Sequence, residues 1–187
     1  MAKLWARLCS KASSILELGG NIGFYSVIGG KSARKTYTVV EPVPEAAAVL
    51  GTNLWRNKLS RIEVVEAAAI AGSNEHDVCL CLPEEGRAMR VGAHLKDGVK
   101  ISKRSISRNI VVKGLPITQP IEGRDLIKIE AEGIEHELST AAMPYIEQHK
   151  PAIVVEVLPE SQKLAALIAG PDCCSPPAAL PWTSLPG

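Results

Sequence analysis

Short apolar and β-branched segments recur along the chain and predict buried strands. Three of them lie at Ser14–Leu18, Thr36–Pro42 and around Ile62–Val65, and two more lie at Asp125–Gly133 and Ala152–Val157. The last of these is apolar at nearly every position, which is typical of a strand that is covered on both faces. These five segments are the strongest strand signals in the sequence.

Segments with helical spacing separate these strands. Residues Pro44–Asn57 have proline near the start, and Ala47, Leu50 and Leu54 recur on one face. A short helix is expected from near Ile22, and a longer one over residues 134–150. Parallel strands need crossover connections, so this alternation predicts an α/β fold with a doubly wound, mostly parallel, Rossmann-like sheet covered by helices.

The middle of the chain, residues 74–123, has a less regular pattern. We expect strands at His76–Pro83 and Arg108–Leu115, as excursions or edge strands between polar loops. Cys79 and Cys81 alternate on the first of these and share one face. They have no Cys-x-x-Cys or histidine partner at metal-ligand spacing, so buried small apolar residues are the favoured interpretation.

Composition predicts one domain followed by a different kind of segment. The 187 residues, 46% of them hydrophobic, suffice for one core. Five of the 13 prolines fall in the last 17 residues, which excludes a central strand there. We therefore expect a folded domain over residues 1–170 and an irregular, proline-rich tail over residues 171–187.

Charge and cysteine content exclude several classes of protein. The chain has 21 basic and 20 acidic residues, neither in a long block, and only 4% aromatic residues, which disfavours a nucleic-acid partner. No apolar run approaches the roughly 20 residues of a membrane span, and the start lacks an apolar signal-peptide core. The odd number of cysteines, five, is not a disulfide framework, so a cytoplasmic protein is expected.

A glycine-rich corner follows the first strand in the stretch "SILELGGNIGFYS". It comprises Glu17, Gly19, Gly20, Asn21 and Gly23. Ligands of open α/β sheets bind at such corners, where glycine lets backbone approach and the next helix offers its amino end. The dinucleotide pattern Gly-x-Gly-x-x-Gly fails because Leu18 occupies the place of its first glycine. The pattern acid-x-Gly-x-Asn-x-Gly instead favours S-adenosylmethionine, with Glu17 facing its ammonium end directly or through water.

A second acid, Glu41, ends the second strand 24 residues after Glu17 and precedes Pro42. A carboxylate at that place can accept hydrogen bonds from both ribose hydroxyls of a nucleoside cofactor. Nicotinamide cofactors use an acid placed in the same way, so Glu41 alone does not discriminate between them. The alternative is that Glu41 is a surface glutamate that ends a strand and has no functional role.

Four blocks of this sequence occur in the order found in FkbM-family methyltransferases, which the chain resembles over roughly Ile15–Val157. They are "ILELGGNIGFYS", "VVEPVPEAAAVLGTNLWRN", "AAAIAG" and "DLIKIEAEGIEHELSTAAMPYIEQHKPAIVVEV". The resemblance implies a class I, Rossmann-like enzyme that moves a methyl group from S-adenosylmethionine to a hydroxyl of a sugar or natural product.

The resemblance also assigns residues. Glu17, Gly19, Asn21 and Gly23 match the first cofactor motif, Glu41 the ribose acid, and Ala68, Ala69 and Ile70 the segment that borders the adenine. The later signature is matched by Lys128, Glu130, Glu132, Gly133 and Glu135. Lys128 and Glu132 are candidate acceptor contacts, and Glu130, where the family usually has aspartate, is a candidate base or acceptor-positioning residue. An equally good interpretation pairs Glu130 with Lys128 or with a backbone donor.

Two further points qualify this interpretation. His136, between Glu135 and Glu137, superficially suggests a metal site, but adjacent helical residues point in different directions, so a solvated helix face and no metal are expected. After Val157 the sequence has one helix and the tail, where related enzymes have a closing hairpin. Its loss would expose a sheet edge that could pair with a second copy of the chain.

Three functions remain open from the sequence. They are a methyltransferase acting on a small hydroxyl acceptor, a degenerate relative that binds cofactor or a protein without turnover, and a nicotinamide-dependent oxidoreductase, which only Glu41 supports.

Overall fold

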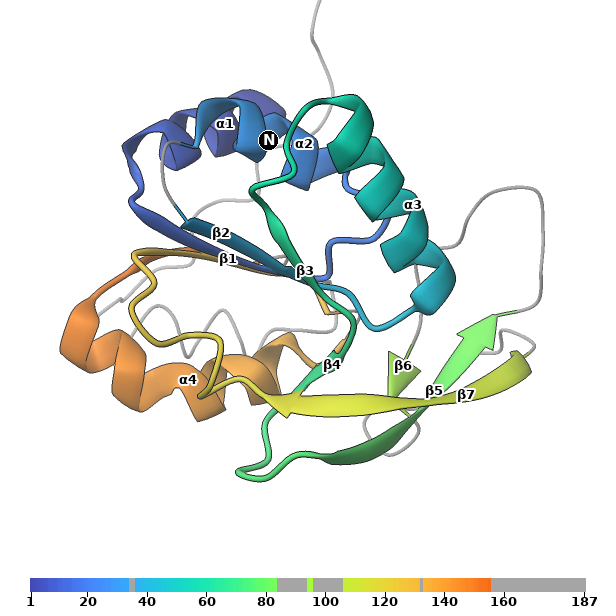
Figure 1. The fold of residues 1–187 in the computed structure, drawn as a ribbon. Helices are drawn as coiled ribbons and strands as arrows, with labels where there is room; N and C mark the ends of the chain where they lie inside the picture. The colour runs from blue at the N-terminus through green and yellow to red at the C-terminus, as the bar shows by residue number, and fades with distance from the viewer. Residues whose placement is uncertain (34–35, 84–93, 96–105, 132, 156–187) are drawn as a thin grey trace, which may run out of the picture.

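The computed structural model describes residues 1–33, 36–83, 94–95, 106–131 and 133–155 (Figure 1). Within these residues, a sheet of five parallel strands has the order β3-β2-β1-β8-β9. The strands are β1 (Ser14–Leu18), β2 (Thr36–Val40), β3 (Glu63–Val65), β8 (Leu126–Ile129) and β9 (Ala152–Val155). The predicted α/β, doubly wound sheet is therefore confirmed. The predicted loss of the closing hairpin and the predicted irregular tail fall on residues outside the described ones, and both stay predictions, as does pairing of the sheet edge with a second copy.

The strand predicted over Asp125–Gly133 is shorter than expected and ends at Ile129. Its continuation leaves the sheet because the N–H groups of Ala131 and Gly133 donate to the Glu135 carboxylate instead of to a neighbouring strand. Gly133 has a φ of 107°, which is incompatible with an extended strand.

Helices cover both faces of this sheet. On one face lie α1 (Ala2–Lys11), α2 (Phe24–Ser32) and α3 (Pro44–Arg56), and α4 (Glu135–His149) lies on the other (Figure 1). The first of these, α1, was not expected from the sequence. It is held by Trp5 and Cys9, which are buried one turn apart, and by the Trp5 indole N–H, which donates to the Tyr25 carbonyl.

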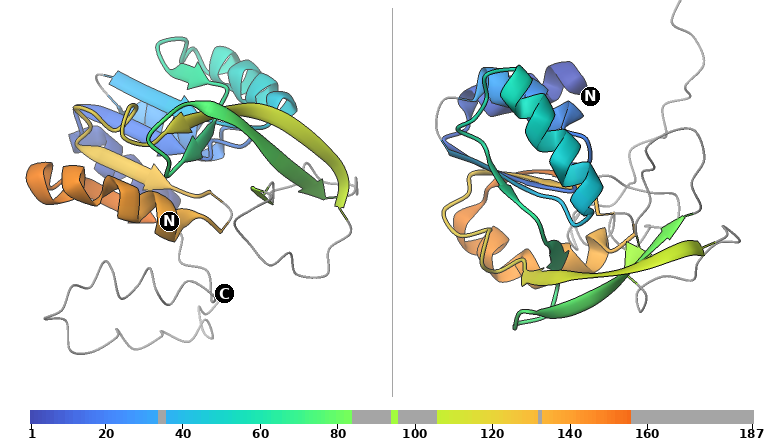
Figure 2. Two further views of the ribbon diagram at one scale, coloured as in Figure 1. Left: turned by 90° about the horizontal axis from the view of Figure 1, so that it is seen from below. Right: turned by 45° about the vertical axis from the view of Figure 1, so that its right-hand side comes forward.

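After β3 the chain leaves the central sheet and forms a second sheet. It consists of β4 (Ala68–Ile70), β5 (His76–Pro83), β6 (His94–Leu95) and β7 (Ile106–Pro116) in the order β4-β7-β5-β6. Strands β5 and β7 form a long antiparallel pair that extends away from the central sheet (Figure 2). The expected excursion is confirmed, whereas β4 was not anticipated as a strand.

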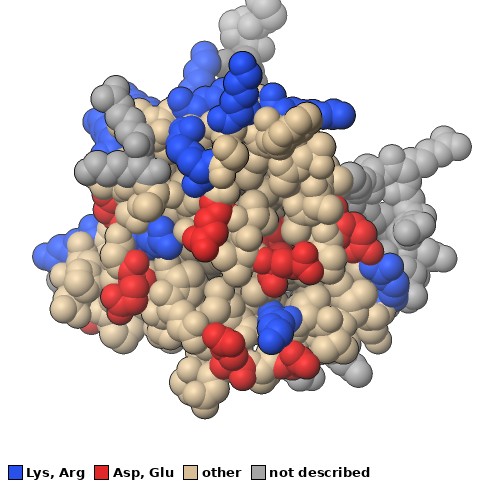
Figure 3. Space-filling view, in the orientation of Figure 1, with Lys and Arg blue, Asp and Glu red and all other residues tan. Residues whose placement is uncertain are grey.

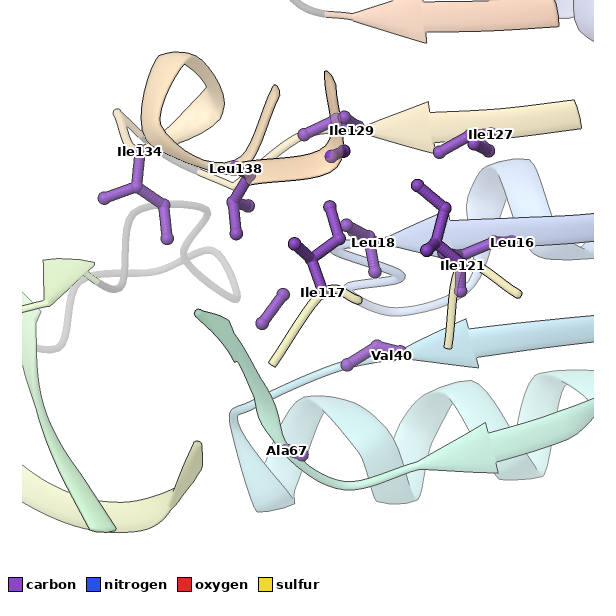
Figure 4. Packing of buried hydrophobic residues seen from close by; sticks show 12 residues of the cluster. Leu16, Leu18, Val40, Ala67, Ile117, Ile121, Ile127, Ile129, Ile134 and Leu138 are labelled. Carbon is purple, nitrogen blue, oxygen red and sulfur yellow. The ribbon is translucent and has the colours of Figure 1, made fainter. Parts of the chain in front are cut away.

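Side chains of the central sheet alternate between two apolar cores. Leu16 and Leu18 point toward α4, together with Ile127 and Ile129 (Figure 4). Ile15 points to the other face, into the cluster formed with α1, α2 and α3. Because β1 alternates, Glu17 lies on the same face as Ile15, beneath the three amino-terminal helices.

Cys79 is half-buried and Cys81 is buried, and both are free thiols. The described residues contain no group of three or more histidine, cysteine, aspartate or glutamate side chains that are arranged to hold a metal ion. None of the helices in the described part of the chain has the length and apolarity that crossing a membrane requires.

Candidate functional site

The topological switch point of the central sheet lies between β1 and β8. From β1 the strand order continues to β2 and β3 on one side, and from β8 to β9 on the other. Ligands of open α/β sheets bind beyond the carboxyl ends of the strands at this point. The glycine corner, Glu41 and Glu130 all follow carboxyl ends of these strands.

The glycine corner is tightly fixed by its own chain. Gly19 and Gly20 both donate to the Val40 carbonyl at the end of β2. A Cβ on Gly19 would lie 1.8 Å from the Glu130 carbonyl oxygen, and a Cβ on Gly20 would lie 2.2 Å from a Val39 methyl. Glycine is therefore required here by the close approach of β1, β2 and the end of β8.

The same corner sets where α2 begins. Asn21 has a φ of 48° and Gly23 a φ of 89°, and Gly23 is the N-cap residue. Two left-handed residues cannot continue a helix, so α2 starts at Phe24 and not near Ile22 as expected.

Glu41 directly follows β2 and is in contact with the glycine corner. Its Oε2 accepts a hydrogen bond from the Asn21 N–H at 2.7 Å, and its Oε1 accepts one from the Val43 N–H at 3.0 Å. Burial raises the pKa of this carboxyl group, and the two N–H donors oppose that rise. Each oxygen keeps further lone-pair capacity, so the carboxylate both ties the two loops together and can accept hydrogen bonds from a ligand.

Glu17 is enclosed by protein beneath the corner and is 1% exposed. Its Oε2 accepts hydrogen bonds from the Tyr37 hydroxyl at 2.5 Å and the Ser26 hydroxyl at 2.9 Å. Its Oε1 has no hydrogen-bond partner among the described residues and lies 3.7 Å from Lys128 Nζ. Burial raises the pKa of the Glu17 carboxyl group, and the Lys128 charge is the largest opposing influence.

Lys128 links the two sides of the switch point. It stands beside Glu17 in the register of β1 and β8, and its ammonium also forms an ion pair with Glu130. Nζ lies 4.8 Å from the centre of the Tyr25 ring, within the range of a cation–π contact. Only 4% of the residue is exposed. The predicted acceptor contact of Lys128 stays a prediction, and its observed contacts are with protein groups.

The structure shows one of the two interpretations of Glu130, the pairing with Lys128. The Glu130 backbone N–H donates to the Leu18 carbonyl, so the residue is bound to the end of β1. Its side chain remains 29% exposed, and its action on an acceptor stays a prediction. Glu132 lies outside the described residues.

Sequence reasoning missed two side chains that build the site, Ser26 and Tyr37, and gave Glu135 no role beyond its place in the later signature. Ser26 and Tyr37 hold Glu17, and Glu135 accepts hydrogen bonds from Ala131 and Gly133 at 2.9–3.1 Å. Tyr37 lies two residues from Val39, the register partner of Glu17, on the same face of β2, and this register is not visible in the sequence. A signal for Glu135 was its place two residues after a glycine at the start of a helix.

The segment expected to border an adenine forms β4. Ala68, Ala69 and Ile70 are buried there, at 4%, 9% and 4% exposed. The Glu41 N–H donates to the Val65 carbonyl at the end of β3, so the chain leading into β4 passes beside Glu41. Contact of β4 with a nucleobase stays a prediction, as does a contact made by the half-buried Pro42.

The histidine-containing turn is not a uniformly solvated face as expected. Glu135 is 1% exposed because its carboxylate turns back to the loop after β8, whereas Glu137 is exposed. His136 is half-buried, and its Nδ1 has no hydrogen-bond partner among the described residues. The three side chains point in different directions, as their adjacency on a helix requires.

No protein-family model and no curated protein sequence matches the chain. Solved structures that it resembles include a precorrin-6y C5,15-methyltransferase from Geobacter metallireducens, with a TM-score of 0.49, 12% identity, and coverage of 88% of this chain and 65% of that one. A putative O-methyltransferase from Klebsiella pneumoniae gives a TM-score of 0.43 and 15% identity over 78% of this chain and 51% of that one.

An O-methyltransferase from Bacillus cereus in complex with SAH gives a TM-score of 0.34 and 23% identity over 35% of this chain. The chain covers about a third, 32%, of the length of that structure. Because these TM-scores lie below 0.5, the fold class rests on the strand order described above.

Proposed function

We propose that the protein is an S-adenosylmethionine-dependent methyltransferase of the FkbM type that acts on a hydroxyl of a small sugar or natural-product acceptor. The observation that carries this proposal is the Glu41 carboxylate, which follows β2 and is hydrogen-bonded to Asn21 in the glycine corner. This contact supports the proposal because it brings the candidate ribose acid and the candidate cofactor corner together beside the switch point.

The residues at this edge fit the cofactor. Glu41 has acceptor capacity for the ribose hydroxyls, and the amino end of α2 provides a positive partial charge for a carboxylate. Oε1 of Glu17 accepts no hydrogen bond among the described residues and lies 3.7 Å from the Lys128 ammonium. The ammonium end of the cofactor would approach this enclosed carboxylate from the corner, directly or through water.

The bound cofactor would supply a methyl group that is activated for in-line displacement by its sulfonium. The chain's own residues then have to place the acceptor oxygen and handle its proton. Glu130 is the candidate for this task, because it follows β8 at the switch point and its side chain is partly exposed. Placement of this kind can lower a barrier by several kcal/mol, and general-base help contributes about 10²–10⁴ in rate.

One observation favours a second candidate, a relative that binds the cofactor without turnover. Lys128 engages the Glu130 carboxylate in an ion pair, so an acceptor hydroxyl would compete with that ammonium for the same oxygens. In this alternative the cofactor edge is retained and the acceptor step is lost.

Calorimetric titration with S-adenosylmethionine, S-adenosylhomocysteine and NAD, followed by a methyl-transfer assay over sugars and glycolipid headgroups, separates the candidates. Binding of the two adenosyl compounds together with transfer supports the proposal. Binding without transfer to any acceptor supports the second candidate. Binding of NAD alone contradicts both.

A pair of variants tests the carrying observation. Glu41→Gln loses the charged acceptor and is expected to weaken S-adenosylhomocysteine binding about 10- to 100-fold, since hydrogen bonds to charged groups contribute about 1.5–3 kcal/mol. Glu45→Gln, an exposed neighbour on α3, is the matched control and is expected to bind as the wild type does. Equal affinities of the two variants for S-adenosylhomocysteine would contradict a contact between Glu41 and the cofactor.

A further inference from the structure

The charge of the chain is divided unevenly along the sequence. Residues 1–62 contain nine Lys and Arg and three Asp and Glu, and residues 63–187 contain the other 12 and 17 of the 21 basic and 20 acidic residues. The amino-terminal part is therefore +6 and the remainder −5, although the whole chain is +1. An asymmetry of this size indicates an anionic partner for the basic part.

In the fold, this positive charge gathers on the outside of the layer formed by α1, α2 and the carboxyl end of α3. We define the basic face by six exposed residues, Lys3, Arg7, Lys11, Lys31, Arg56 and Lys58. Figure 3 shows Lys and Arg side chains along the top of the molecule, over these helices, whereas Asp and Glu side chains lie lower down together with further Lys and Arg side chains.

The acids of the amino-terminal part do not neutralise this face. Glu17 and Glu41 are buried at the carboxyl ends of the strands, at 1% and 5% exposed. Glu45 is in the first turn of α3, at the opposite end of that helix from Arg56, and it pairs with Arg108 of β7. Neither α1 nor α2 contains an acidic residue.

Large apolar side chains are interspersed with these charges. Leu4 on α1 is 53% exposed and precedes Arg7 by three residues, and Trp55 on α3 is 74% exposed and precedes Lys58 by three residues. Trp5 of α1 is buried in the core, so the outer side of that helix presents Leu4 among Lys3 and Arg7. Interfacial helices combine basic residues with Leu and Trp in this manner.

We propose that the basic face docks on an anionic phospholipid surface. Several Lys and Arg side chains on one face are attracted to the negative potential of such a surface, and Leu4 and Trp55 add apolar contact at the headgroup level. A single-stranded nucleic acid is less well matched, because few aromatic rings are available for base stacking: Trp55 is 74% exposed, and Phe24, at the opposite end of α2 from Lys31, is 61% exposed. This proposal does not depend on the proposed enzymatic function.

Sedimentation of the full chain with vesicles tests the proposal. Vesicles of phosphatidylcholine with about one third phosphatidylserine are compared with phosphatidylcholine alone, at low and high salt. Binding is expected only to the anionic vesicles, and high salt is expected to weaken it. The double variant Arg7→Glu, Lys11→Glu is expected to reduce partitioning by at least about 30-fold.

A matched control separates surface charge at this face from net charge. Lys113→Glu combined with Lys150→Glu changes the net charge equally at exposed positions on β7 and after α4, and is expected to retain most of the binding. Circular dichroism establishes that both double variants fold. No binding of the wild type to anionic vesicles, equal losses in the two double variants, or tighter binding to a DNA duplex than to vesicles would each overturn the proposal.

Discussion

Replacing Lys128 by methionine is expected to expose the electrostatic cost of burying Glu17. Lys128 is 4% exposed and Glu17 is 1% exposed, and Nζ lies 3.7 Å from the unpartnered Oε1. Methionine keeps the approximate length and apolar volume of the lysine stem and removes its charge. The buried carboxylate then keeps only its bonds from Tyr37 and Ser26.

Breaking a buried ion pair by removing one partner costs about 3–5 kcal/mol. That is a large part of a typical unfolding free energy of about 5–15 kcal/mol. Burial already raises the pKa of Glu17, and loss of Lys128 removes the main influence that lowers it. A carboxyl group with a raised folded-state pKa contributes stability that is present below its ordinary pKa and is lost as pH rises through the raised pKa.

The difference in unfolding free energy between the wild type and Lys128→Met is therefore expected to be small near the ordinary carboxyl pKa of 4.5 and to grow as pH rises above it. Urea titrations followed by circular dichroism across this range measure it. The double variant Glu17→Gln, Lys128→Met is expected to recover most of the loss at the alkaline end. Lys113→Met, at an exposed site, is the control and is expected to change stability by less than about 0.5 kcal/mol.

A loss for Lys128→Met that is equal at all pH values would refute this account of the pair. So would a double variant that is as unstable as the single one, because the cost would then arise from packing and not from the uncompensated Glu17 carboxylate.

Three further changes test the architecture of the site. Gly19→Ala places a Cβ 1.8 Å from a backbone oxygen at a φ of 80° and is expected to lower the melting temperature strongly. The control Gly51→Ala, in open space on α3, is expected to raise the unfolding free energy by up to about 1 kcal/mol. Similar melting temperatures for the two variants would contradict this account of the packing. Tyr37→Phe removes the 2.5 Å hydrogen bond to Glu17 and is expected to cost about 1.5–3 kcal/mol. The loss in urea titrations is expected to be larger at higher pH, because the Tyr37 hydroxyl lowers the pKa of the Glu17 carboxyl group; a loss that is greater in acid would contradict this. Glu135→Ala leaves the N–H groups of the loop after β8 without their acceptor. Amide hydrogen exchange is therefore expected to become faster in that loop and to stay unchanged in β1. Unchanged exchange in the loop would show that Glu135 does not position it.

Local patterns in the sequence were sufficient to predict the strands of the central sheet and the position of Glu41 at the end of β2. Apolar runs of four or five residues identified the parallel strands, and an acid followed by proline marked the end of β2. Two elements had weaker signals. The helix α1 buries only Trp5 and Cys9 fully among exposed basic residues, and β4 has three residues and follows β3 after a gap of two.

The pairing of Lys128 with Glu130 could be predicted because the two residues are close in sequence, but the contact of Lys128 with Glu17 could not, because it depends on the order of strands in the sheet. Glu17 meets Lys128 only because β8 adds beside β1, although the two residues are far apart in sequence. The glycines show the same limit. Their pattern indicated a corner without side chains, but only the fold shows that the Glu130 carbonyl oxygen occupies the space that a Cβ on Gly19 would need.

The proposed adenosyl-cofactor site lies at the carboxyl edge around β1 and β2. Backbone amide chemical shifts recorded while S-adenosylhomocysteine is added to the ¹⁵N-labelled protein test it most directly. We predict saturable shifts that are largest at residues 19–23 and 41–43, extend to residues 68–70, and are small in α1 and β9. No saturable shifts, or shifts concentrated away from the glycine corner and Glu41, would contradict the account.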